Sequence, residues 1–133
     1  MTYKDQEFPS IESFEIGAFD VDRFTHEAHV YVAWSYLQTT SLMDAIVRFS
    51  GALKRITMKL GIPGKYHETI TWFFMLMVAQ RREASNTNDW HEFRDANQDL
   101  VGEAKNLLDR YYTGELLASD SARRVFMLPD KVA

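Results

Sequence analysis

The apolar residues of this chain recur at helical spacing, most regularly over residues 41–60. Within that segment they stand three or four positions apart, at Leu42, Ile46, Phe49, Leu53, Ile56 and Leu60. Ser41 suits the N-cap because its hydroxyl accepts a backbone N–H, and Gly61 suits the position after the helix because glycine adopts the left-handed conformation. We predict a helix over 41–60 that ends before Pro63-Gly64.

Two segments on either side are richer in apolar residues and predict helices over 21–38 and 66–82. The run WFFMLMVA, residues 72–79, is apolar on every side of a helix. Such a helix is typically surrounded by protein, either within its own chain or at an interface with a second copy. The pattern predicts the helix over 66–82 as the centre of the fold, and its surface is also a candidate homodimer interface.

The second half of the chain predicts shorter elements. One helix begins near Asp89-Trp90, a helical stretch covers 100–112, and Ser119 is placed to cap a short helix over 120–126. No segment shows the alternation of apolar and polar residues that indicates a strand. We therefore predict an all-α fold, a compact bundle of about four main helices with short additional helices.

The domain prediction is a single helical domain over 20–133. Residues 1–19 contain Pro9 and Gly17 and only loosely spaced apolar residues, so we expect them to form an extended N-terminal arm. A length of 133 residues, with 46% hydrophobic and 26% charged residues, is ordinary for one domain with a core of its own.

Composition excludes several classes of site. The chain has no cysteine, which rules out disulfides, thiolate zinc sites, iron–sulfur clusters and a cysteine nucleophile. The polar, acidic N-terminus does not fit a signal peptide, and the longest apolar run is too short to cross a membrane. A net charge of −4 argues against general nucleic-acid binding. We expect a soluble, cytoplasmic protein.

Three histidines stand near the starts of two predicted helices. His26 and His29 are three residues apart on one side of the helix over 21–38, and His67 begins the helix over 66–82. If those ends pack together, the three imidazoles meet. This hypothesis predicts a small-molecule ligand pocket with seven residues: His26, His29, His67, Glu68, Trp34, Tyr66 and Trp72.

The three histidines could have one of three roles: metal ligands, a general base, or structural hydrogen bonds. Imidazole and carboxylate ligands suit a divalent transition metal such as zinc, iron, copper or nickel, with His26, His29 and His67 as the metal ligands. A neutral imidazole also serves as a general base. Equally, histidines at helix starts often make structural hydrogen bonds within a core. No His-Glu-x-x-His motif is present, so we assign no catalytic residue and leave open whether the chain is an enzyme.

Two hypotheses from different classes follow. The first is a small helical protein that binds a metal or a small ligand through the histidine cluster. The second is a non-catalytic, homo-oligomeric interaction protein whose histidines are structural. The distances among the imidazoles and the presence of a cavity beside His67 distinguish the two.

Three segments of the sequence also resemble a known protein family. The segments FTHEAHVYVAWSYL, GIPGKYHETITW and SARRVFMLPD resemble those of a family of small, functionally uncharacterised bacterial all-helical proteins. The resemblance covers about residues 20–130. It implies a small helical cytoplasmic protein from a bacterium, and it implies no activity and no site residue.

Overall fold

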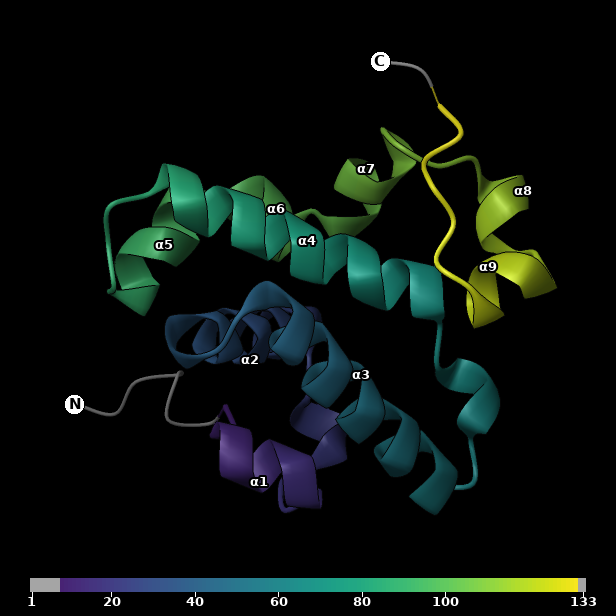
Figure 1. The fold of residues 1–133 in the computed structure, drawn as a ribbon, viewed down its shortest axis with the longest axis horizontal. Coiled ribbons are helices and arrows are strands. Elements are labelled where there is room, and N and C mark those ends of the chain that lie inside the picture. Colours follow the sequence, from purple (N-terminus) through teal and green to yellow (C-terminus); the bar gives the residue numbers. More distant parts are fainter. Residues whose placement is uncertain (1–7, 132–133) are drawn as a thin grey trace.

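Two apolar helices, α2 (His26–Thr39) and α4 (Glu68–Ala84), pack along one another at the centre of the structure. A third long helix, α3 (Leu42–Lys59), packs against both of them (Figure 1). The computed structural model describes residues 8–131, and over that range it contains helices and no strand. The predicted all-α fold is therefore confirmed.

The long helices begin where short polar side chains satisfy their first backbone N–H groups. The Thr25 hydroxyl accepts from the Ala28 N–H at 3.3 Å at the start of α2, and the Ser41 hydroxyl accepts from the Asp44 N–H at 3.1 Å at the start of α3. Gly61 follows α3 with φ of 75°, as predicted. The helix predicted from residue 21 is two pieces, because the chain first makes a 3₁₀ turn, η2 (Val21–Arg23), before α2.

Helix α4 is covered by its own chain. Helices α2 and α3 pack on it, and α9 (Asp120–Arg124) packs near its N-terminal end. Phe73, Met75 and Val78 are buried, and the other large apolar residues of α4 pack at least partly against the core. The prediction of a central helix is confirmed, and this coverage removes the reason for placing a homodimer seam there.

The remaining elements are short. The turn η3 (Pro63–Lys65) joins α3 to α4, and the second half of the chain forms α5 (Trp90–Ala96), α6 (Gln98–Gly102), α7 (Ala104–Asp109) and α8 (Gly114–Leu117) before α9. Ser119 caps α9 as predicted. The stretch predicted over 100–112 is split between α6 and α7, and α8, capped by Thr113, was not predicted. None of the described helices is long and apolar enough to cross a membrane.

Part of the predicted extended arm is helical. Ser10 caps α1 (Ile11–Ile16), and Gly17 ends it with φ of 74°. Phe14 in this helix is fully buried and stacks on Phe49 at a centroid distance of 5.1 Å. Helix α1 forms instead of an extended segment because Phe14 has a place in the core to fill. Residues 1–7 of the predicted arm lie outside the described residues.

Candidate functional site

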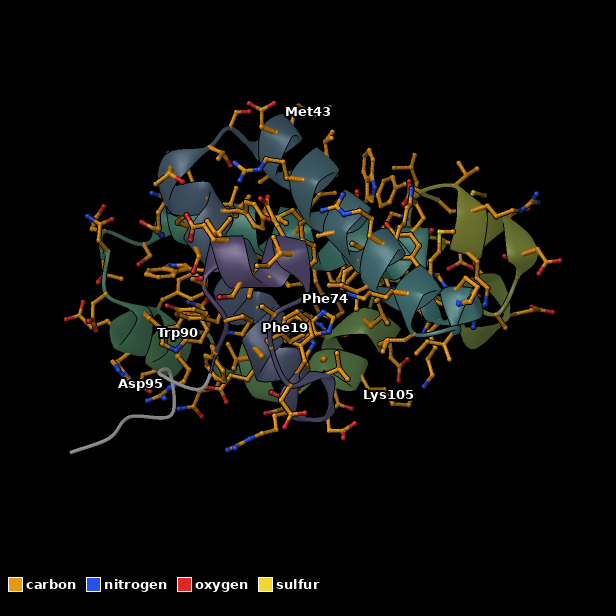
Figure 2. The ribbon with its side chains drawn as sticks, turned by 90° about the horizontal axis from the view of Figure 1, so that it is seen from below. Phe19, Met43, Phe74, Trp90, Asp95 and Lys105 are labelled. Atoms are coloured by element: carbon orange, nitrogen blue, oxygen red, sulfur yellow. The ribbon has the colours of Figure 1, made fainter. Side chains whose placement is uncertain are left out.

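A cavity of about 670 Å³ lies among α2, α3 and α4, bordered by the segments 19–24 and 60–67. Its walls are mostly aromatic and aliphatic. Figure 2 labels two of the wall residues, Phe19 and Phe74, near the middle of the molecule, and Trp90 to one side. The larger side chains of the wall are Phe19, Phe24, Phe49, Phe74, Tyr66, Leu53, Ile56, Ile70 and Met75.

All three predicted histidines border this cavity, and the helix spacing explains two of them. His29 and Val30 follow His26 by three and four residues, and Ala33 follows them by four and three, so all four share the face of α2 that borders the cavity. His67 reaches it from the start of α4. The three histidines therefore border one cavity, although His26 meets α4 at Phe74, seven positions after His67.

His67 is held by two hydrogen bonds. Its Nδ1 accepts from the Ile70 N–H at 3.2 Å, which makes His67 the N-cap of α4. Its Nε2–H donates to the Leu117 carbonyl at 2.8 Å, across 50 positions of sequence. Because Nδ1 accepts and Nε2 donates, His67 is a neutral imidazole with both nitrogens in use. Its role is structural, tying α4 to α8.

His26 is held by one hydrogen bond. Its Nε2 lies 3.0 Å from the Leu100 carbonyl oxygen and donates to it, since that oxygen only accepts. The ring also meets Phe74 edge-on, at a centroid distance of 4.7 Å. Burial lowers the pKa of His26, although the bond to Leu100 opposes that shift. His26 thus ties α2 to α6.

His29 differs from the other two. It makes no hydrogen bond to any residue in the described part of the chain, and its ring lies 4.2 Å from that of Phe24 and 6.2 Å from that of Phe49. The ring retains a partly accessible surface where it borders the cavity. Burial, and secondarily the positive charge that His26 would carry, lower the pKa of His29 to about 4. The side chain is therefore neutral near pH 7.

The other predicted pocket residues are placed differently. Tyr66 borders the cavity, and its hydroxyl donates to Glu68 Oε1 at 2.5 Å, so Glu68 lies behind Tyr66 and outside the cavity wall. The Lys54 ammonium lies 3.8 Å from the same carboxylate oxygen. Trp34 and Trp72 do not border the cavity: Trp34 contacts Trp90 and Phe93, and Trp72 stacks on Phe126 at 5.3 Å.

The geometry does not support the predicted metal site. Across residues 8–131, no three histidine, aspartate or glutamate side chains lie close enough together to hold a metal ion. His67 in particular has no free ring nitrogen, because one caps α4 and the other bonds to Leu117. Bordering one cavity does not make the three imidazoles a coordination set, which needs nitrogens about 2 Å from a common point.

The outer part of the cavity was not predicted. Val21, Leu60 and Ile62 are apolar residues that border it and are 39%, 47% and 42% exposed. Asp22 and Lys65, both exposed, border it as well, and they bring one charge of each sign. Leu60 caps the C-terminal end of α3 and closes the apolar stripe predicted over 41–60, whereas the other four residues lie in or beside the turns that precede α2 and α4, where apolar periodicity is lost.

No family model, no curated protein and no solved structure matches this chain. The resemblance to small bacterial helical proteins, and the bacterial setting that it implies, therefore remain predictions.

Proposed function

We propose that this protein binds a small, predominantly apolar molecule in the cavity among α2, α3 and α4. The observation that carries the proposal is the cavity itself, whose volume of about 670 Å³ falls among those of small-molecule sites. Such sites commonly enclose roughly 300–1,000 Å³, with apolar and aromatic walls and a few polar groups. The wall around His29 has this composition.

The size of the space argues for an occupant. The cavity is open to solvent on one side, so without a ligand its apolar walls face water, which costs free energy. The exposed apolar residues at the outer part add to this cost, because Val21, Leu60 and Ile62 keep apolar surface in contact with water. A bound apolar molecule would restore contacts inside and remove surface from water outside.

Binding fits the side chains better than catalysis. His26 and His67 both donate to backbone carbonyls, so neither is paired with a hydroxyl or carboxylate in the arrangement that activates a nucleophile. Their hydrogen bonds fix the cavity wall by joining α2 to α6 and α4 to α8. We therefore favour a ligand-binding protein with structural histidines over the metal-dependent alternative.

The test is a titration with N-phenyl-1-naphthylamine, an uncharged apolar dye whose fluorescence rises in apolar surroundings. Leu53→Trp fills part of the cavity from α3, and Leu42→Trp is the matched control, since Leu42 is a partly buried leucine of the same helix outside the cavity wall. We expect saturable binding by the wild type and by Leu42→Trp, and at least tenfold weaker binding by Leu53→Trp.

Circular dichroism and melting temperature establish that both variants are folded before the titrations are compared. Absence of saturable binding by the wild-type protein would contradict the proposal. Equal affinities of the wild type and Leu53→Trp would place the dye elsewhere on the surface and would likewise contradict it.

A further inference from the structure

Among the described residues that border the cavity, His29 is the histidine whose ring nitrogens make no hydrogen bond, and its side chain is only partly exposed. The neighbouring His26 and His67 each bond to a carbonyl oxygen. His29 instead contacts the rings of Phe24 and Phe49 and borders the open space. The fold thus fixes its position and leaves its nitrogens available.

We propose that His29 selects the ligand of this cavity, and that the ligand is an uncharged apolar molecule with one hydrogen-bonding group, such as a hydroxyl, at its buried end. The inference rests on the proposed function, because it assigns the chemistry of the molecule that would occupy the same cavity. It adds a specificity residue and a ligand class.

The hydrogen-bonding group follows from the state of His29. A neutral imidazole has one donor and one acceptor nitrogen, and burying these without partners costs free energy. A ligand hydroxyl that bonds to either nitrogen recovers that cost, whereas a purely hydrocarbon ligand does not. Sites of this kind reject analogues that lack the bonding group, because the buried polar atom is then left unpaired.

The absence of charge on the ligand follows from the surroundings of His29. The pKa of His29, lowered to about 4, leaves no positive charge there at neutral pH. Lys65 borders the cavity but is exposed to solvent, and Asp22 at the same outer part has the opposite charge. A carboxylate beside His29 would lose its hydration without gaining a counter-ion.

Three naphthalene compounds test the inference, because they share one ring system and differ in one substituent. They are naphthalene, 2-naphthol and 2-naphthoate. We expect the wild-type protein to bind 2-naphthol roughly three- to tenfold more tightly than naphthalene, the range that one net hydrogen bond supplies, and 2-naphthoate more weakly than 2-naphthol.

His29→Phe should abolish the preference for 2-naphthol and keep the affinity for naphthalene, since phenylalanine preserves the ring and removes its nitrogens. Ser35→Ala is the control, because it removes a polar group from the same helix α2 outside the cavity wall and leaves His29 in place. We expect Ser35→Ala to retain the preference. Isothermal titration calorimetry at pH 7.5 measures all of these affinities.

A direct readout comes from the ¹⁵N chemical shifts of the His29 ring nitrogens, which move when either nitrogen gains a hydrogen bond. We expect them to shift with 2-naphthol and to stay near their free values with naphthalene. A merely structural histidine would show the same small response to both compounds.

The outcomes separate the two proposals. If the wild type binds naphthalene and 2-naphthol equally, the cavity is a binding site and His29 does not select its ligand. If His29→Phe retains the preference, another group makes the hydrogen bond, and the inference is again overturned. If neither compound binds, both the proposed function and the role of His29 are wrong.

Discussion

Helix α2 has two faces that both carry aromatic and apolar contacts, but one face is tightly packed and the other borders a cavity. On one face, Tyr31 and Trp34 meet Trp90 and Phe93 in ring contacts between 5.2 and 6.3 Å. None of these four residues borders the cavity. On the other face, aromatic residues also gather, yet they border a cavity of about 670 Å³ that includes His29 and is open to solvent on one side. We call the first the aromatic cluster and the second the cavity face.

The difference lies in the small and polar residues between the rings. Trp34 reaches across the aromatic cluster, whereas its neighbour Ala33 projects only a methyl group toward the cavity. His26 and His67 turn their nitrogens to backbone carbonyls, which holds the helices around the cavity at fixed positions. Aromatic content therefore does not decide whether a core is filled; side-chain volume at a few positions does.

The largest expected effect is on the filled side. Phe93 is fully buried, so Phe93→Ala should lower the free energy of unfolding by about 3–5 kcal/mol. Phe74→Ala, the matched change on the cavity face, should cost at least about 1 kcal/mol less, because Phe74 already borders open space and has fewer contacts to lose. Urea denaturation measures both. Equal losses would mean that the cavity face is packed as densely as the aromatic cluster.

Acid should lower the free energy of unfolding through the protonation of His29 on the cavity face. Its pKa is about 4 in the folded protein against an ordinary value of 6.5, so between these values the unfolded chain takes up a proton that the folded chain does not. The free energy of unfolding should therefore fall as the pH drops from about 6.5 to about 4, by up to ~3 kcal/mol, and level off below.

His29→Phe is the control for this acid effect. The variant lacks the titrating group, so the difference between the wild-type and variant unfolding free energies isolates His29 from the carboxylates. The bond from Arg81 lowers the pKa of Asp99 to about 2, so the stability that this carboxylate contributes to the protein is lost only below its ordinary pKa of 3.8. A wild-type curve parallel to that of His29→Phe between pH 6.5 and 4 would show that His29 is not buried.

The two faces also differ in how far the sequence predicted them. Helical spacing placed His26 and His29 on one side of α2, and the apolar run of α4 predicted its central position. Spacing could not distinguish the Trp34 side of α2 from the cavity side, because both are apolar. The bond from His67 to Leu117 spans 50 positions, and local pattern contains no information on such a partner.

The helix ends that neighbouring residues determine were predicted, whereas a helix that depends on a distant contact was not. Ser41, Gly61 and Ser119 were predicted correctly because each acts on its immediate neighbours. Helix α1 was missed although Ser10 and Gly17 are capping residues, because it is a short helix that depends on placing Phe14 in a distant core.

His67 tests whether the cavity wall is held by hydrogen bonds. His67→Ala should lower the free energy of unfolding by about 2 kcal/mol, since it removes both the N-cap of α4 and the bond to Leu117. His67→Asn should recover about 1 kcal/mol of this, because asparagine can cap the helix. Thermal and urea unfolding measure both variants, and a neutral His67→Ala would exclude the structural role assigned to this residue.

The smallest effect separates His29 from its two neighbours most sharply. At pH 7.5, in the absence of ligand, His29→Phe should change the free energy of unfolding by less than about 1 kcal/mol, because no hydrogen bond is lost and the contacts with Phe24 and Phe49 are preserved. A residue that stabilised the fold through its nitrogens would behave instead like His67. A loss above about 2 kcal/mol, measured by urea unfolding, would show that the His29 nitrogens are already bonded within the protein. His29 would then not differ from His67, whose two nitrogens are both hydrogen-bonded.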